Sequence, residues 1–228
     1  MKITYLITVY NEIKTVEQSI LDIINIQYPK KEIIIIDNGS TDGSQKIIKK
    51  FNKIKKVLRK KNIGFGRTIE EGIKKAKGKY IYIQYSDLEY DHQKSIYMMN
   101  YAESKNLDVV LGSRLKNNNS STIKILMKKP SYLATIICTF LINKFYGKNF
   151  TDIIGAKLYR VNTIKKIPIN SYQQGFDFEF ISRICKKKYK IGEVSIKYKP
   201  RINSSEKKIK FYHMFIALYC IFKVKFFE

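Results

Sequence analysis

The sequence predicts an α/β fold: a doubly wound, mostly parallel sheet flanked by helices, with an amphipathic segment at the C-terminal end. Apolar runs of strand length alternate with helical periodicities, which is typical of parallel strands joined by crossover helices. Residues 33–36 are isoleucine throughout, as in a strand buried on both faces. Polar residues follow three such runs, at the strand ends where open α/β sheets bind their ligands.

The first half of the chain alternates regularly. Residues 2–9 predict a strand, after which Val16, Ile20 and Ile23 recur at helical spacing until Pro29 ends the helix. Gly, Asn and Asp punctuate the stretches that follow. After the strand at 33–36 we expect a Lys-rich helix at 44–51, a short strand at 57–58, a helix at 66–76, a strand at 80–84, a helix at 93–104 and a strand at 107–112.

The second half is less regular. We expect a polar loop at 116–122, strands at 155–159 and 191–198 and a helix at 178–187. The apolar run 132–142 predicts a helix that is either buried or lies against a membrane. The run 211–222 fits an interfacial helix, the start of a membrane segment or a terminal helix on the core. We expect one domain at 1–210, with halves at 1–115 and 116–210, and an apolar, basic segment at 211–228.

Charge and cysteine usage narrow the setting. The net charge is +25, from 44 basic and 19 acidic residues, which favours contact with an anionic membrane surface or a polyanion. No apolar run reaches the roughly 18–20 residues that span a bilayer. Three cysteines without metal-site spacing and a start that does not resemble a leader favour the cytoplasm. We therefore expect a cytoplasmic protein, peripheral at the inner face of the membrane.

Two common phosphate-binding motifs are absent from the sequence. Gly64, Phe65 and Gly66 lack the third glycine of a dinucleotide fingerprint, because position 69 is Ile, and there is no P-loop. Nucleic acid is not an expected partner, since no recognised motif for it occurs. Nucleotide binding would therefore use side chains at the strand ends.

Eight short motifs, in order, resemble family 2 glycosyltransferases. They are TVYNE at 8–12, IDNGSTD at 36–42, NIGFG at 62–66, QYSDLEYD at 84–91, GSR at 112–114, FTD at 150–152, GFDFE at 175–179 and EVSIKYKPR at 193–201. That family has the GT-A fold, which is Rossmann-like, and uses nucleotide-diphosphate sugars. The likeness is greatest to polyprenyl-phosphate sugar transferases such as dolichyl-phosphate mannose synthase, and it covers about residues 1–210.

The resemblance implies a nucleotide site made of Tyr10, Glu12, Asp37, Gly64 and Ser86. The chemistry of Asp37 agrees, since a carboxylate at a strand end can accept a hydrogen bond from a base N–H or a sugar hydroxyl. The alternative for Asp37 is a residue that only caps the turn after its strand.

The resemblance also implies a site for Mg²⁺ or Mn²⁺. The family's Asp-x-Asp motif holds the ion against the donor diphosphate, but here Tyr85 replaces the first Asp. Asp87 matches the second Asp, and Glu89 matches a further ligand. We expect the two carboxylates to alternate on an extended segment and face one ion, because one or two carboxylates plus phosphates suffice for Mg²⁺. The alternative is that both only cap a loop.

The reaction implied is displacement at the anomeric carbon with inversion. Asp87 would take part through the metal, which stabilises the leaving group. A hydroxyl acceptor must lose a proton, and the base candidates are Asp152 and Glu179, or Asp177. A lipid phosphate instead needs cations.

Arg114 and Arg201 are the candidates for that phosphate, because a guanidinium binds it in a two-pronged fork. The alternative for each arginine is a surface ion pair.

Three functions remain open at this point. The preferred one is sugar transfer from a nucleotide-diphosphate sugar to polyprenyl (dolichyl or undecaprenyl) phosphate at the cytoplasmic membrane face. A second uses the same fold to glycosylate a hydroxyl of a surface glycan. The third is a catalytically inert nucleotide-sugar-binding protein, for which Tyr85 in the metal motif is the argument. The oligomeric state stays open.

Overall fold

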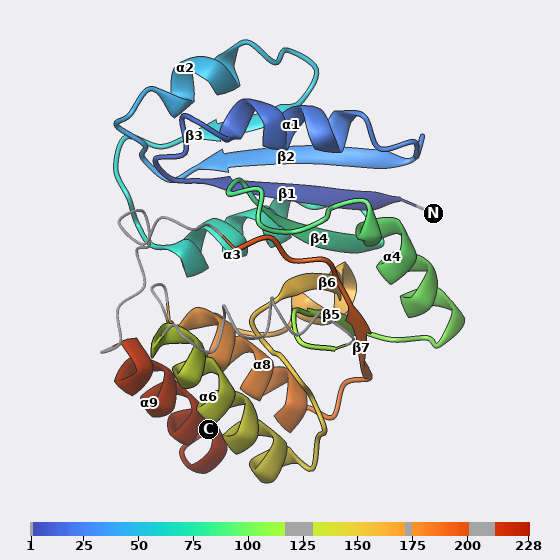
Figure 1. The fold of residues 1–228 in the computed structure, drawn as a ribbon, viewed down its shortest axis with the longest axis vertical. Helices are drawn as coiled ribbons and strands as arrows, with labels where there is room; N and C mark the ends of the chain where they lie inside the picture. Colours follow the sequence, from blue (N-terminus) through green and yellow to red (C-terminus); the bar gives the residue numbers. More distant parts are fainter. Residues whose placement is uncertain (1, 117–129, 172–174, 201–212) are drawn as a thin grey trace.

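The computed structural model describes residues 2–116, 130–171, 175–200 and 213–228. Within these ranges a single sheet has the strand order β3-β2-β1-β4-β6-β5-β7 (Figure 1). The strands are β1 Ile3–Val9, β2 Lys31–Asp37, β3 Lys55–Leu58, β4 Tyr80–Tyr85, β5 Val109–Ser113, β6 Ala156–Arg160 and β7 Ile191–Ser195. Only the β6 pairings, with β4 and β5, are antiparallel among these strands. The predicted mostly parallel α/β fold is confirmed.

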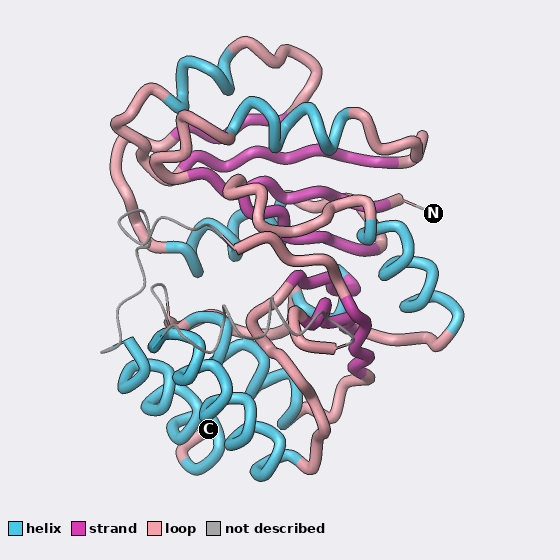
Figure 2. The backbone as a smooth tube through the Cα atoms, viewed as in Figure 1, coloured by secondary structure: helices cyan, strands magenta, loops and turns pink. Residues whose placement is uncertain are grey.

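Helices cover both faces of the sheet, so the fold is doubly wound (Figures 1 and 2). The helices are α1 Val16–Ile24, α2 Ser44–Lys49, α3 Phe65–Lys75, α4 Lys94–Ser104, α6 Pro130–Tyr146, α7 Val161–Ile164, α8 Phe176–Lys186 and α9 His213–Phe226. Side chains of β1 alternate between two hydrophobic clusters, because successive residues of a strand point to opposite faces. Tyr5 and Ile7 belong to the cluster that includes residues of α1, α2 and α4, whereas Leu6 belongs to the cluster that includes residues of α3, α6, α8 and α9.

The parallel strands β1, β2 and β4 end at the same edge of the sheet. Their register pairs Val9 with Asp37 and Thr8 with Tyr85. The polar residues that follow these strands are therefore neighbours, although long stretches of sequence separate them. We refer to this edge as the carboxyl edge.

Helix α3 approaches the sheet closely because it carries a glycine at the contact. A Cβ atom on Gly72 would lie 2.1 Å from Cδ2 of Leu6 on β1. The approach brings the N-terminal end of α3, which follows the loop after β3, near the carboxyl edge.

Helices α6, α8 and α9 form a layer beyond the second half of the sheet (Figure 1). The runs 132–142 and 211–222 prove to lie largely within α6 and α9. Helix α9 buries Ala217, Ile221 and Val224, so it packs on the core as the third alternative expected. None of the helices in the described ranges combines the length and apolarity required to cross a bilayer.

Candidate active site

The loop after β1 is bonded to the loop after β2. Ser40 Oγ accepts a hydrogen bond from the Asn11 amide at 2.8 Å, and Ser44 Oγ accepts one from the Glu12 amide at 3.1 Å. Asn11 has a left-handed φ of 53° and accepts from the Thr41 amide at 2.9 Å. These bonds hold Tyr10 and Glu12 at the carboxyl edge, beside the end of β2. Contact with a nucleotide stays a prediction for both.

Asp37 is fully buried at the end of β2. Its Oδ1 accepts hydrogen bonds from the amides of Gly39 at 3.1 Å and Ser40 at 2.9 Å, and from Gln45 Nε2 at 2.6 Å. Its Oδ2 is buried and has no hydrogen-bond partner among the described residues. Oδ1 therefore caps the turn. Oδ2 is removed from water without gaining a hydrogen bond in return, which costs free energy.

The turn after β2 is tied to the loop before α3. Asn38 accepts from the Ile63 amide at 3.1 Å and donates to Asn62 Oδ1 at 2.8 Å. Gly39 has φ +82°, and a Cβ there would lie 2.3 Å from the backbone of Lys61, so only glycine fits. Gly64, with φ +96°, precedes α3 and donates its amide to Asn62 Oδ1 at 2.8 Å. The structure thus brings Gly64 close to the Asp37 turn.

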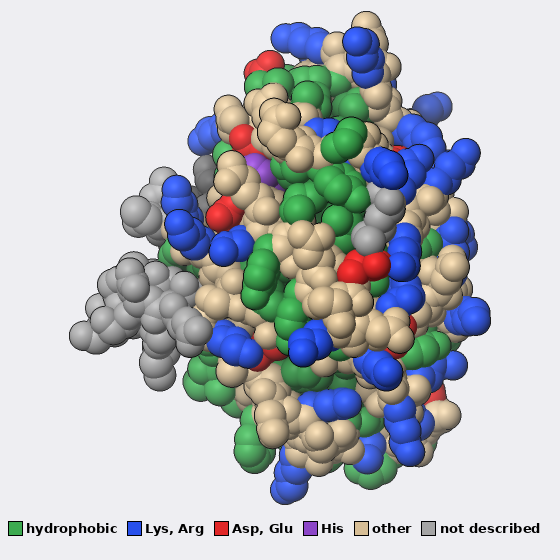
Figure 3. Space-filling view, turned by 90° about the vertical axis from the view of Figure 1, so that its right-hand side faces the viewer, with side chains coloured by type: hydrophobic (Ala, Val, Ile, Leu, Met, Phe, Trp, Pro, Cys, Tyr) green, Lys and Arg blue, Asp and Glu red, His purple; other side chains and the backbone are tan. Residues whose placement is uncertain are grey.

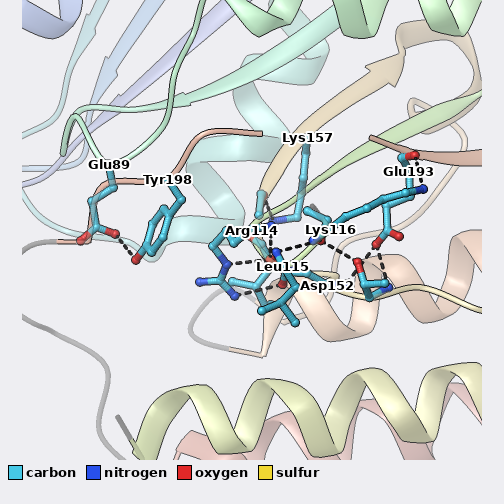
Figure 4. A network of polar contacts seen from close by, with 12 residues as sticks. Glu89, Arg114, Leu115, Lys116, Asp152, Lys157, Glu193 and Tyr198 are labelled. Carbon is cyan, nitrogen blue, oxygen red and sulfur yellow. Dashed lines mark hydrogen bonds and ion pairs between the residues drawn. The ribbon is translucent and has the colours of Figure 1, made fainter. Parts of the chain in front are cut away.

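The segment after β4 differs from the expected extended chain. Ser86 and Asp87 form a turn, and Leu88 has a left-handed φ of 58°. Asp87 Oδ1 caps this turn by accepting the Glu89 amide at 3.1 Å. Glu89 Oε2 accepts from the Tyr198 hydroxyl at 2.8 Å (Figure 4). The expectation of alternation on an extended segment is therefore wrong, because Asp87 lies in a turn and Leu88, between the two carboxylates, has a left-handed backbone.

Ser86 has a structural partner of its own. It is 3% exposed, and its hydroxyl donates to the Thr8 carbonyl at 2.9 Å, which joins the end of β4 to β1. Its contact with a nucleotide stays a prediction.

Tyr85, in the place of the family's first Asp, belongs to a row of aromatic rings. Its ring stacks on Phe65 at 5.7 Å and meets Tyr90 at 5.7 Å, and Phe65 in turn meets Phe176. Burial, followed by the charge of Asp177, raises the pKa of Tyr85 well above its ordinary value. The phenol stays neutral, so it does not supply the negative charge that a carboxylate would.

A buried lysine lies under this ring. Lys157 on β6 is 1% exposed, and its Nζ lies 3.0 Å from Oδ1 of Asp177 and 3.4 Å from the Tyr85 hydroxyl. The Ile154 carbonyl also accepts from this ammonium at 3.0 Å. Asp177, in the first turn of α8, is thereby held beside Tyr85 at the carboxyl edge.

Arg114 and Asp152 form a buried ion pair (Figure 4). Arg114 Nε donates to Asp152 Oδ2 at 2.6 Å and Nη2 to Oδ1 at 3.0 Å. Burial would raise the pKa of Asp152, but the charge and hydrogen bonds of Arg114 outweigh it and lower the pKa. Tyr132 and Tyr198 each lie 5.4 Å from the guanidinium. The arginine and the carboxylate are thus each other's partners, and their roles in transfer stay predictions.

Glu179 pairs with a neighbour on its own helix. Glu179 is 3% exposed and pairs with Arg183 at 2.8 Å, while Ser171 donates its amide to it at 2.6 Å. Neither partner lies at the end of a parallel strand. Arg201 lies outside the described residues.

The residues at the turn after β4 can hold a hard cation only if a bound ligand supplies further oxygen atoms. Within the described ranges, no cluster of three His, Cys, Asp or Glu side chains could hold a metal. Asp87 is the carboxylate at this turn, Glu89 is bonded to Tyr198, and Tyr85 is neutral. Oxygen atoms of a diphosphate and water could complete an octahedral shell around Mg²⁺ or Mn²⁺. The donor set therefore fits an ion that arrives with a diphosphate.

Sequence reasoning missed the part played by Lys157 and Tyr198. The signal available for Lys157 was a lysine inside the predicted strand 155–159, since a lysine buried in a strand needs a counter-charge. Tyr198 carried no such signal, because its partners Glu89 and Arg114 come from distant loops.

A doubly wound sheet with polar and acidic side chains at its carboxyl edge defines the class of open α/β proteins, whose ligand sites lie at the carboxyl ends of the strands. Within that class the chain belongs to glycosyl transferase family 2, whose family model matches residues 4–167. The resemblance seen in the sequence motifs is confirmed at the level of the family.

The chain is similar over part of its relatives' length to curated poly-beta-1,6-N-acetyl-D-glucosamine synthases. It is 29% identical over 206 residues to a poly-beta-1,6-N-acetyl-D-glucosamine synthase of Staphylococcus epidermidis, with 87% of this chain and 48% of the relative covered. The Staphylococcus aureus (strain COL) synthase of that name is 34% identical over 128 residues, covering 54% of this chain and 31% of the relative. The chain thus spans about half or less of the length of these relatives. Neither name refers to a polyprenyl phosphate, so the closer likeness expected is not supported.

Solved structures share the fold. Glucosyl-3-phosphoglycerate synthase of Mycobacterium tuberculosis with UDP superposes with a TM-score of 0.73 at 14% identity, covering 98% of this chain and 79% of that one. S. aureus TarS 1-349 with UDP-GlcNAc gives 0.64 at 17% identity, covering 100% and 68%.

Proposed function

We propose that the chain is an inverting glycosyltransferase domain that moves a sugar from a nucleoside-diphosphate sugar to a hydroxyl of a glycan. The observation that carries the proposal is the set of three carboxylates at the carboxyl edge. Asp37 ends β2, Asp87 lies in the turn after β4, and Asp177 is held beside Tyr85 by Lys157. Family membership supports it, as do relatives named poly-GlcNAc synthases and fold neighbours with UDP or UDP-GlcNAc.

The donor would lie across the ends of β1, β2 and β4. Asp37 offers its unpaired Oδ2 to a base N–H or a ribose hydroxyl, while its Oδ1 keeps the turn in place. Tyr10, Glu12 and Gly64 flank this position, and Ser86 links it to β4. Asp87 would hold Mg²⁺ or Mn²⁺ together with the donor diphosphate, with Glu89 close by. When bound, the ion neutralises the charge that develops on the departing diphosphate.

The protein's part in the chemistry is to place the acceptor and to take its proton. The acceptor oxygen bonds to the anomeric carbon as the bond to the diphosphate oxygen breaks, and the configuration inverts. A hydroxyl loses its proton in this step, so a base is needed. Asp177 is our candidate, because it lies at the carboxyl edge. Asp152 and Glu179 remain candidates from the sequence, but both oxygens of Asp152 accept from Arg114, and Glu179 pairs with Arg183.

A polyprenyl phosphate acceptor is the second candidate. It is favoured by a broad exposed apolar surface on α6 and α9, described below, which suits work at the cytoplasmic face of a membrane. Arg114 would have to leave Asp152, at least in part, to bind a lipid phosphate.

One activity assay tests the proposed function. UDP-sugars are offered with Mn²⁺ and either a glycan oligosaccharide or a short-chain polyprenyl phosphate as acceptor. We expect transfer to the oligosaccharide, and Asp87→Ala should lower it by about 100-fold or more while Asp91→Ala has little effect. Transfer only to the lipid would establish the second candidate. Tight UDP binding without any transfer would point to the inert binding protein and refute both enzymes.

A further inference from the structure

Large exposed apolar side chains gather on one part of the molecule. Fifteen large hydrophobic residues of the described chain are exposed, and ten of them lie on α6, on α9 or directly after α9. These ten are Leu133, Ile136, Ile137, Phe140, Phe215, Ile216, Tyr219, Phe222, Phe226 and Phe227. We call them the α6/α9 face. Clusters of this kind mark docking surfaces, whereas single exposed hydrophobic residues do not.

Both helices are apolar on two opposite sides. Helix α6 buries Cys138 and Ile142, and it exposes Leu133, Ile137 and Phe140, with Phe140 62% exposed. In α9 the exposed residues repeat at helical spacing, from Phe215 at 63% through Tyr219 at 65% to Phe222 and Phe226. A surface helix normally turns a polar face outward, and a helix that is apolar all round is normally enclosed. The outward sides of α6 and α9 therefore have the composition of a buried surface.

The two exposed sides adjoin. Phe145 of α6 meets the rings of Phe222 and Phe226 at 5.4 and 5.7 Å. Lys225 of α9 donates to the Phe145 carbonyl at 2.8 Å. Figure 1 shows the helices side by side at the end of the molecule away from α2. The apolar side chains thus form a single surface that crosses both helices.

The helix layer around this face is basic. Residues 130–148, 176–190 and 213–228 contain nine basic and three acidic residues. Each acidic side chain is already paired: Asp177 with Lys157, and Glu179 and Glu228 with Arg183. Figure 3 shows a different face, the right-hand side of Figure 1, on which lysine and arginine side chains also outnumber acidic ones.

We propose that the α6/α9 face docks on an anionic lipid bilayer, with both helices lying along its surface. Apolar aromatic side chains enter the boundary between head groups and acyl chains, and the surrounding lysines meet the anionic head groups. Charge decides between this occupant and a second copy of the chain. A two-fold interface through this face would bring the basic layers of both copies together, and like charges repel.

Vesicle flotation with the full chain tests the docking. Vesicles of phosphatidylcholine with phosphatidylglycerol are compared with vesicles of phosphatidylcholine alone, without any sugar donor. The face variant is Phe140→Gln, Phe215→Gln and Tyr219→Gln together. Its matched control, Leu21→Gln, Ile24→Gln and Tyr97→Gln, also replaces three exposed hydrophobic residues, but outside the face. Circular dichroism and thermal unfolding confirm that both variants fold.

We expect the wild type and the control to float with the anionic vesicles and to bind neutral ones more weakly. The face variant should lose at least about tenfold in partitioning, because apolar insertion and charge act together. Three results would overturn the proposal. The wild type does not float with the anionic vesicles, the face variant floats as well as the wild type, or the wild type binds both vesicle types equally. The proposal would also be overturned if analytical ultracentrifugation showed that the wild type and the control are dimers and the face variant is a monomer. The outcome is independent of transfer activity, because no donor is present.

Discussion

Lys157 Nζ lies 3.0 Å from Oδ1 of Asp177, and the lysine side chain is 1% exposed. Lys157 is the second residue of β6, next to the end of β4, and Asp177 is in the first turn of α8. A buried ammonium is stable only with a counter-charge, so the pair joins the sheet to the helix layer. It also holds a carboxylate at the point where Tyr85 has replaced one.

The role of Asp177 as a base can be separated from a structural one. Asp177→Asn keeps the size and an acceptor oxygen for Lys157, but it cannot take a proton at neutral pH. Urea unfolding of the variant measures separately what loss of the counter-charge costs the fold. We expect kcat to fall about 100-fold to 10,000-fold with little change in KM for the donor. The control is Glu179→Gln, whose partner Arg183 lies within α8, and it should keep kcat. The opposite pattern, with only the Glu179 variant losing kcat, would return the base role to Glu179.

Tyr85→Asp restores the two-carboxylate motif with Asp87. Metal affinity rises with the number of charged ligands, so we expect Mn²⁺ to bind about tenfold more tightly in the presence of UDP. An electron paramagnetic resonance titration of free Mn²⁺ measures this directly. Tyr85→Phe, which removes only the hydroxyl 3.4 Å from Lys157, should leave the affinity unchanged. Unchanged Mn²⁺ affinity in the Asp variant would mean that residue 85 does not face the ion.

Asp37→Asn tests the unpaired oxygen of Asp37. The amide keeps one acceptor for the turn and replaces the other oxygen with a donor. We expect UDP affinity to fall about 10-fold to 100-fold, since a hydrogen bond to a charged group contributes about 1.5–3 kcal/mol. Titration calorimetry measures it. Asp91→Asn is the matched control, because Asp91 caps its own turn through the Gln93 amide at 3.0 Å. Equal losses in both variants would count against a direct contact.

Breaking the Arg114–Asp152 pair should lower the free energy of unfolding more than breaking an exposed ion pair does. Asp152→Ala leaves a buried guanidinium without its partner, and we expect a loss of about 3–5 kcal/mol in the free energy of unfolding. Urea unfolding measures it. Arg67→Ala removes a largely exposed pair with Glu70 and should cost no more than about 1 kcal/mol. Similar losses in the free energy of unfolding for the two variants would show that the buried pair stabilises the fold no more than the exposed pair does.

Lowering the pH should remove the contribution of the Arg114–Asp152 pair to the stability of the fold. The pKa of Asp152 is lower in the folded chain than its unfolded value of about 3.9, so its ionised form stabilises the fold above that pH. The contribution is lost as the pH falls through the lowered pKa of the folded state. The stability gap between wild type and Asp152→Asn should therefore narrow below about pH 4, as urea unfolding at several pH values would show. A gap that stays constant would contradict the lowered pKa.

Local signals account for much of what could be predicted. Strands at 2–9 and 80–84 and the helix after Gly64 appear close to their expected bounds, because hydrophobic periodicity and turn residues act over a few positions. The turn at 86–88 was missed, since a left-handed leucine is rare and carries no sequence mark. The strand expected at 191–198 ends at Ser195, and Tyr198 instead bridges to Tyr90 from a distant loop.

The sequence by itself determined the α/β class, the family motifs and the acidic strand ends, because each is a short-range pattern. Only the tertiary structure decided that β6 lies antiparallel between β4 and β5, and that Arg114 pairs with Asp152. It also decided that the outer sides of α6 and α9 stay exposed. These features depend on which surfaces meet across long separations in the chain, and the packing of the whole molecule settles that choice.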